Sequence, residues 1–290
     1  MVQVDLITGF LGAGKTTFLR RYAAYLAGQG ERVCILENDF GAVNVDAMLV
    51  QDLLELGCEI ETISGGCDCD THQRRMRTKL ISMAMRGFTR VLVEPSGIFD
   101  VDEFFDVLRD DPLDRWYQLG NVIAIVDALL PEQLSPQADY VLASECANAG
   151  LVLLSRSQLA KPGQCEAAVA HLKRALTACK CSRVFQPEEI LAKDWAALTE
   201  ADMARIARCG MRQASCEKLH FEEHEAFSSA YFLELGLPRT RLERNIPGQW
   251  VELNATADGL TASPLAQGQQ VLIVIGEGLD KAAIEQKLRN

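Results

Sequence analysis

A glycine-rich stretch near the N-terminus has the residue types and the spacing needed to bind the phosphates of a nucleotide. Residues 9–16 read Gly-Phe-Leu-Gly-Ala-Gly-Lys-Thr, which fits Gly-x4-Gly-Lys-Thr, and they follow a short apolar run. In such a loop backbone amides surround the phosphates, the lysine reaches the β- and γ-phosphates, and the threonine holds Mg²⁺. We expect Lys15 to act on phosphates rather than to belong to the core, and we expect hydrolysis of the γ-phosphate. The predicted nucleotide-binding residues of this loop are Gly12, Ala13, Gly14, Lys15, Thr16 and Thr17.

Acidic residues follow two of the predicted strands. Glu37 and Asp39 come after the apolar run 32–36, and Glu94 follows the run 90–93, three residues before Gly97. A carboxylate at a strand end can hold Mg²⁺ through water, and a glycine amide can sense the γ-phosphate. We therefore assign Glu94 and Gly97 to the nucleotide site and the turn after residue 36 to a switch. A strand-ending carboxylate without a ligand is the alternative for Glu94.

Two thiols lie between a predicted strand at 59–63 and a basic helix predicted from about residue 71 to 86. Cys67 and Cys69 are one residue apart, and Asp70 follows them. Two thiolates this close cannot complete a tetrahedral zinc site, but adjacent loops can add carboxylates, and thiolates suit Zn²⁺, Co²⁺ or iron. Asp70 is either an oxygen ligand or the cap of the helix. A metal site and a purely structural role both remain open for this segment.

Composition narrows the possible partners. The chain has 290 residues, 48% of them hydrophobic and 24% charged, with a net charge of -11. Nucleic acids and anionic membranes attract clusters of Lys and Arg, so the charge argues against both as partners. No apolar run approaches the length of a membrane span and no leader segment is recognisable, so we expect a cytoplasmic protein. Most of the ten cysteines, including Cys34, are expected to be structural thiols.

The chain alternates strand and helix patterns, which predicts an α/β fold with a mainly parallel sheet covered by helices on both faces. Strands are expected at 2–7, 32–36, 59–63, 90–93, 122–126 and 151–154, with a candidate seventh at 184–185. Residues 208–215 lack periodicity and are predicted to link a nucleotide-binding domain, 1–210, to a small α+β domain, 216–290. In the second domain we expect strands at 250–255 and 270–275 and a last helix capped by Asp280.

Together these motifs resemble the CobW-type branch of the SIMIBI P-loop GTPases, relatives of the UreG and HypB nickel-insertion proteins. The resemblance rests on residues 8–17, 37–41 with Asp46, 66–69, 94–97 and 125–128. It implies a GTP-dependent, Mg²⁺-requiring metal chaperone or insertase that serves a metal- or corrinoid-dependent client protein. By this resemblance Lys15 stabilises phosphate charge, Thr16 and Glu94 hold Mg²⁺ directly or through water, Gly97 reports the γ-phosphate, and Asp39 and Asp46 are switch residues.

The chain departs from the family pattern at two places. The family motif is Cys-x-Cys-Cys, and this chain has Asp70 in place of its third cysteine. Ala42 stands where relatives tend to have Glu. The metal ligands that the resemblance implies are therefore Glu37, Cys67, Cys69 and Asp70. The base motif, Asn- or Thr-Lys-x-Asp in relatives, reads Ser155-Arg156-Ser157-Gln158 here. A glutamine lacks the charge that favours two guanine donors, so we expect a weaker preference for GTP over ATP. The alternative function is a nucleotide-binding regulatory protein whose GTPase and metal-binding activities have decayed.

Overall fold

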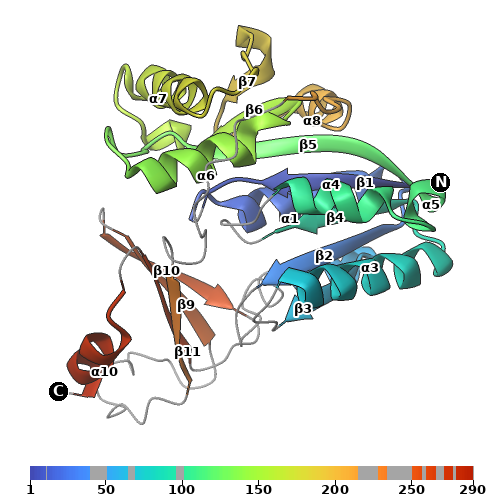
Figure 1. Ribbon diagram of the computed structural model, residues 1–290, viewed down its shortest axis with the longest axis horizontal. Helices are drawn as coiled ribbons and strands as arrows, with labels where there is room; N and C mark the ends of the chain where they lie inside the picture. The colour runs from blue at the N-terminus through green and yellow to red at the C-terminus, as the bar shows by residue number, and fades with distance from the viewer. Residues whose placement is uncertain are drawn as a thin grey trace.

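The N-terminal part of the chain folds into a seven-stranded parallel sheet with the order β3-β2-β4-β1-β5-β6-β7 (Figure 1). The strands are β1 (Val2–Thr8), β2 (Val33–Asp39), β3 (Glu59–Ser64), β4 (Arg90–Glu94), β5 (Tyr117–Asp127), β6 (Leu151–Ser155) and β7 (Ile190–Ala192). All neighbouring pairs are parallel. The expected α/β fold is therefore confirmed. This computed structural model describes residues 1–10, 12–39, 51–64, 69–95, 101–214, 228–233, 250–256, 259–265, 271–276 and 279–289.

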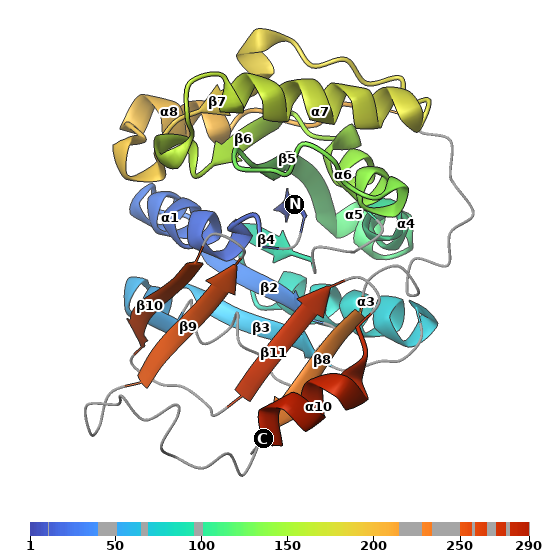
Figure 2. The same ribbon diagram turned by 90° about the vertical axis from the view of Figure 1, so that its left-hand side faces the viewer.

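Helices cover both faces of the sheet, as Figure 2 shows. The longer helices are α1 (Lys15–Gly28), α3 (Cys69–Met85), α4 (Val101–Arg109), α6 (Pro136–Ala147), α7 (Gln164–Ala178) and α8 (Glu200–Ile206). Shorter helical turns are α5 (Leu113–Trp116), η1 (Gln51–Leu56), η2 (Ser157–Leu159), η3 (Pro187–Glu189) and η4 (Trp195–Ala197). Among the described residues no helix is long and apolar enough to cross a membrane.

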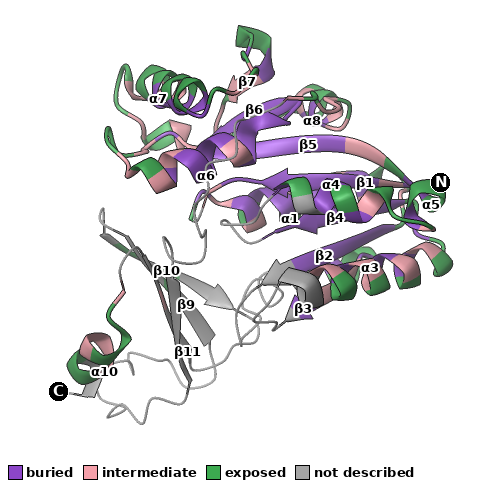
Figure 3. Cartoon of the chain, viewed as in Figure 1, coloured by how far each residue is buried: buried purple, intermediate pink, exposed green. Residues whose placement is uncertain are grey.

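Alternation along the strands divides the core in two. Val33 and Ile35 of β2 belong to the cluster that contains α1 and α8, whereas Cys34 and Leu36 belong to the cluster that contains α3, α4, α6 and α7. Both sides of the sheet are buried (Figure 3), which explains why its strands read as continuous apolar runs. The cluster that contains α1 and α8 positions α1, and with it the glycine-rich loop, at the carboxyl end of β1.

A buried polar network lies within this core, away from the glycine-rich loop. The Asp5 carboxylate accepts hydrogen bonds from the Tyr22 hydroxyl (2.7 Å), from Arg90 Nη1 (3.1 Å) and from the backbone and side-chain amides of Asn121. Burial, and then the Asp5 charge, raise the pKa of Tyr22. The Asn121 side chain also bonds to backbone groups of residues 207–210. The network joins α1, β1, β4 and β5 to the segment after α8.

Two local expectations are wrong. Residues 184–185 form no strand: Val184 is 68% exposed, and Phe185 is buried under the Arg183 guanidinium, so only Phe185 anchors this loop to the core. The seventh strand is β7. Helix α3 begins at Cys69 rather than near residue 71, so Asp70 lies inside the helix and is not its cap.

The segment predicted as a linker is bound to the sheet as far as it is described. Gly210 O accepts from Val122 N (3.0 Å), and Asn148 O accepts from Arg212 N (3.0 Å). Gly150 lies very close to Gly210, because a Cβ added to Gly150 would lie 2.3 Å from the Gly210 carbonyl oxygen. These bonds attach residues 209–214 to the nucleotide-binding part, while the proposed division into domains 1–210 and 216–290 stays a prediction.

The C-terminal part of the chain contains antiparallel strands and a last helix, drawn in orange and red in Figure 1. Strands β9 (Trp250–Thr256) and β10 (Gly259–Leu265) pair with each other, as do β8 (Ser228–Leu233) and β11 (Val271–Gly276). Helix α10 spans Lys281–Arg289, and the Asp280 carboxylate accepts from Ala283 N at 3.0 Å, which confirms the predicted cap. Strands β8 and β10 were not expected from the sequence.

Candidate functional site

The glycine-rich loop turns from β1 into α1 through three glycines with positive φ. Gly9, Gly12 and Gly14 have φ values of 140°, 71° and 94°, which residues with a Cβ rarely adopt. A Cβ on Gly9 would lie 2.2 Å from the carbonyl oxygen of Ile125 in β5, and one on Gly14 would lie 3.1 Å from the ring of Trp195. The glycines therefore allow the loop to lie against the sheet and to present the N-terminal amides of α1 to an anion.

Lys15 is the first residue of α1, and its side chain is buried. It is 7% exposed, and Nζ donates to the Gly9 carbonyl oxygen at 2.8 Å. Lys15 is thus buried, although it belongs to neither apolar cluster of the core. Its ammonium lies over the loop and bonds to Gly9 through one of three N–H donors.

Thr16 and two buried carboxylates meet at the ends of β2 and β4. The Thr16 hydroxyl donates to Glu94 Oε1 at 2.8 Å, and Glu94 is 4% exposed. Glu37, 1% exposed, is the register partner of Glu94 on the neighbouring strand. Hydroxyl and carboxylate oxygens are the ligands that Mg²⁺ prefers, so this donor set fits a magnesium site. Thr17, the next residue, is exposed.

The residues in place of the base motif follow β6. Ser155 is buried, Gln158 is exposed in η2, and Arg156 has φ 54°. The Arg156 guanidinium makes an ion pair with Asp127 at the end of β5 and lies 3.5 Å from the Gly12 carbonyl oxygen. The arginine thus links the ends of β5 and β6 to the glycine-rich loop.

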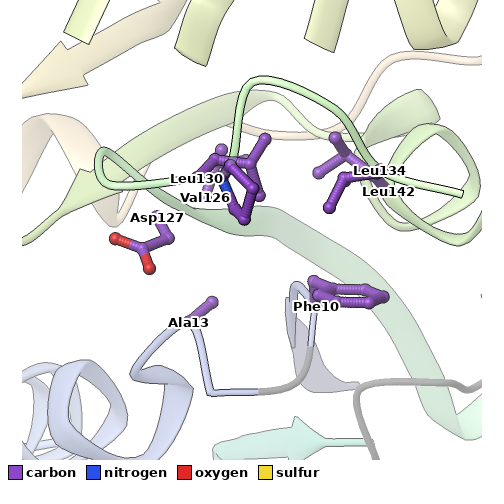
Figure 4. Close-up of a pocket in the computed structure, with 8 residues that line it drawn as sticks. Phe10, Ala13, Val126, Asp127, Leu130, Leu134 and Leu142 are labelled. Carbon is purple, nitrogen blue, oxygen red and sulfur yellow. The ribbon is translucent and has the colours of Figure 1, made fainter. Parts of the chain in front are cut away.

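An apolar pocket of about 170 Å³ lies beside the loop (Figure 4). Phe10 and Ala13 face it from the loop side, and leucines from the β5–α6 connection and from α6 face it from the other. The lining is apolar apart from Asp127, so the pocket offers contact area rather than hydrogen bonds. Its lining residues are Phe10, Ala13, Val126, Asp127, Leu130, Pro131, Leu134 and Leu142.

Comparison with known proteins identifies the family to which this site belongs. Residues 3–184 match the model described as CobW/HypB/UreG, nucleotide-binding domain. The chain belongs to this family. Two relatives are the zinc chaperones YjiA and YeiR of Escherichia coli K12, 31% identical over 169 residues and 30% identical over 165 residues. The YjiA match covers 55% of this chain and 50% of the relative, and the YeiR match covers 56% and 48%.

The chain spans about half the length of these curated relatives of the CobW/HypB/UreG family. A solved structure, the zinc-bound YjiA GTPase from E. coli, is similar with a TM-score of 0.39 and 18% identity. That match covers 100% of this chain and 99% of the solved chain.

Several predicted residues of the CobW-type site are not described. Asp46, Gly97 and Cys67, with Ala42, lie outside the described residues, and for Asp39, Cys69 and Asp70 only the backbone is described, in β2 and α3. Within the described part of the chain no three His, Cys, Asp or Glu residues are grouped to hold a metal ion. Burial, and then the Glu61 charge, raise the pKa of the Cys34 thiol to about 12, consistent with its structural role.

Two residues at this site were not predicted from the sequence. Glu145 of α6 is 1% exposed and accepts from the Gly9 amide at 2.9 Å. Trp195 of η4 lies against Gly14 and packs edge-on against Phe18. Glu145 is the single charged residue in the largely apolar stretch 141–154, and this position could have indicated it, because a buried carboxylate requires partners. No sequence signal pointed to Trp195.

Proposed function

We propose that this chain is a GTP-dependent switch that hydrolyses the γ-phosphate and serves as a metallochaperone or maturation factor. The observation that supports this most is the contact of the Thr16 hydroxyl with the buried Glu94 carboxylate, directly after Lys15. A threonine and a carboxylate that meet beside a phosphate-binding loop are what a magnesium–nucleotide site needs.

In this proposal each residue near the loop has a separate task. Lys15 donates to β- and γ-phosphate oxygens through the N–H groups that do not bond to the Gly9 carbonyl, while the amides at the start of α1 hold the phosphate chain. Thr16 and Glu94 would hold Mg²⁺, which would supply neutralisation of the phosphate charge. In hydrolysis a water oxygen bonds to the γ-phosphorus as the bond to the β–γ bridging oxygen breaks, so GDP leaves with the bridging oxygen and inorganic phosphate is released. Gly97 senses the γ-phosphate, and Asp39 and Asp46 respond as switch residues.

For the base site we propose that the side chains after β6 contact the purine with little discrimination. Arg156 provides its alkyl stem, and the Gln158 amide provides one carbonyl acceptor. Ser155, buried at the end of the strand, fixes the start of this segment. GTP is then the main substrate, and ATP is accepted as well.

The proposed cargo is Zn²⁺ or Co²⁺, held by Glu37, Cys67, Cys69 and Asp70. Soft thiolates and a buried carboxylate suit these ions, and Glu37 lies beside the proposed magnesium site, so the bound nucleotide can influence the cargo. The client is a metal- or corrinoid-dependent protein, and we assign its recognition to residues 216–290. We propose a cytoplasmic location and exclude nucleic acids and membranes as partners on the charge of -11.

One observation favours a second function, a nucleotide-binding regulatory protein without turnover. Gln158 is exposed and uncharged where relatives have an aspartate, and Arg156 pairs with Asp127. Binding of GTP without phosphate release, in the presence of Mg²⁺ and the client, supports this alternative.

Multiple-turnover phosphate release from GTP with Mg²⁺ tests the proposed function. We expect several phosphates per protein, and we expect Lys15→Met to reduce nucleotide affinity by about 2–3 kcal/mol, the value of charge-assisted hydrogen bonds. Methionine preserves the buried volume but removes the donor to the Gly9 carbonyl, so binding is measured at a temperature at which thermal unfolding shows the variant to be folded. Unaltered binding and turnover in Lys15→Met would contradict the assignment of the phosphate site.

A further inference from the structure

The two peptide groups that flank Gly9, the first glycine of the phosphate loop, are each bonded to a buried side chain. The Glu145 carboxylate accepts from the Gly9 amide at 2.9 Å, and the Lys15 ammonium donates to the Gly9 carbonyl oxygen at 2.8 Å. Both side chains are buried, with 1% and 7% exposed. Hydrogen bonds to charged groups are stronger than those between neutral groups, so Gly9 is held firmly by these two contacts.

Gly9 also has no room to shift toward the sheet. Its Cα lies so close to β5 that an added Cβ would be 2.2 Å from the Ile125 carbonyl oxygen, and its φ of 140° is open mainly to glycine. Without Glu145 the Gly9 amide would remain buried against β5 and α6 with no acceptor from that side chain. A buried amide that loses its acceptor carries a desolvation cost, so the loop would rearrange to bond elsewhere.

We propose that Glu145 is a positioning residue, which keeps Gly9 in place while Lys15 reaches the phosphates. This inference rests on the proposed nucleotide function. The Lys15 ammonium has three N–H donors to divide between the Gly9 carbonyl and the phosphates, whereas the hydrogen bond from Gly9 to Glu145 does not compete with the phosphates. The bond to Glu145 therefore holds Gly9 however Lys15 divides its donors, and it lets the loop bind nucleotide without first being reordered.

The proposal assigns this role to the acceptor oxygen of Glu145 rather than to its charge. A glutamine places a carbonyl oxygen where the carboxylate oxygen accepts, whereas a leucine fills the space and offers no acceptor. Leu142, which lines the pocket in Figure 4, precedes Glu145 by three residues on α6, so this part of the helix is already packed on the loop. The two variants separate loss of the hydrogen bond from loss of charge.

The test compares Glu145→Gln, Glu145→Leu and a control on the same helix, Asp139→Asn. Asp139 bonds to His171 at 2.6 Å and does not contact the loop, so its variant reports disturbance of α6 alone. For each protein we would measure KM and kcat for GTP with Mg²⁺ and the hydrogen exchange of the Gly9 amide without nucleotide. We expect Glu145→Leu to raise KM about 10-fold with kcat within about twofold of the parent, because uniform binding is lost.

We expect Glu145→Gln and Asp139→Asn to keep KM within about threefold of the parent value. The Gly9 amide should stay protected in both and exchange faster in Glu145→Leu. An unchanged KM in Glu145→Leu, or an equal loss in Glu145→Gln, would overturn the proposal. If Glu145→Leu does not fold, Glu145→Met replaces it, and an unchanged KM with a protected Gly9 amide in that variant would overturn the proposal. If the unsubstituted protein binds no nucleotide, the proposed function is refuted instead. The hydrogen exchange of the Gly9 amide in the variants then still tests whether Glu145 keeps Gly9 in place.

Discussion

Glu37 and Glu94 should repel each other in protein without Mg²⁺. They are register partners on parallel strands, so their side chains leave the sheet on one face about 5 Å apart, and both are buried. Two unit charges about 5 Å apart at an effective dielectric constant of about 20 repel by about 3 kcal/mol. Glu94→Gln removes one charge and keeps an acceptor for Thr16. We therefore expect this variant to stabilise the metal-free protein by about 1–3 kcal/mol.

Thermal unfolding in EDTA and in Mg²⁺ measures this effect. For a domain of about 150–250 residues 1 kcal/mol changes the melting temperature by about 2–4 °C, so a rise of several degrees in EDTA is expected. Mg²⁺ should raise the melting temperature of the parent and have a much smaller effect on Glu94→Gln. Glu61→Gln is the matched control, since Glu61 makes a favourable pair with Lys79 at 2.6 Å and its loss should not stabilise the protein.

A double-mutant cycle measures the repulsion between Glu37 and Glu94 directly. Glu37→Gln should also stabilise the metal-free protein, and the double variant should gain less than the two single variants together, because the repulsion can be removed only once. A lower melting temperature of Glu94→Gln in EDTA, with Mg²⁺ stabilisation retained, would refute both the repulsion and the magnesium site at these strand ends.

Two further predictions concern the base and the cargo. Gln158→Asp should widen the preference for GTP over ATP by about 10-fold, since a carboxylate accepts from two guanine donors; competition binding with both nucleotides checks this, and an unaltered ratio contradicts it. Co²⁺ titration should give a thiolate-to-metal absorption band that weakens in Cys67→Ala and in Cys69→Ala. The band should also differ between protein with GDP and protein with a non-hydrolysable GTP analogue. A band that is absent, or unaffected by either substitution, contradicts the proposed cargo site.

The sheet was largely predictable because its strands are buried on both faces and read as apolar runs. The runs that became β1 to β6 were recognised, although β5 begins at Tyr117, five residues before the predicted start. The three-residue β7 is too short to give a pattern, and the more apolar pair at 184–185 was chosen instead. Strand predictions were therefore wrong where a strand was too short, or an apolar pair too exposed, for the sequence pattern to distinguish them.

The candidate site was predictable where its residues are neighbours in sequence. Lys15 and Thr16 belong to one motif, and Glu94 follows a buried strand, so spacing alone brought them together. Gly9 and Glu145 are 136 residues apart, and their contact depends on how α6 packs against the end of β1. The contact of Lys15 with the Gly9 carbonyl was not predicted either, because the motif specifies residue types and spacing and not the acceptors around the side chain.

The network around Asp5 limits how a nucleotide signal can travel. Tyr22, in the middle of α1, is bonded to Asp5 in the centre of β1, and Arg90 and Asn121 join the same carboxylate from the two adjacent strands. Releasing any of these groups would leave a buried charge or a buried polar group without its partner, which is costly. We therefore expect α1 not to slide along the sheet when phosphate binds at its first turn. Movement is then restricted to the strand ends and to the connections that follow them.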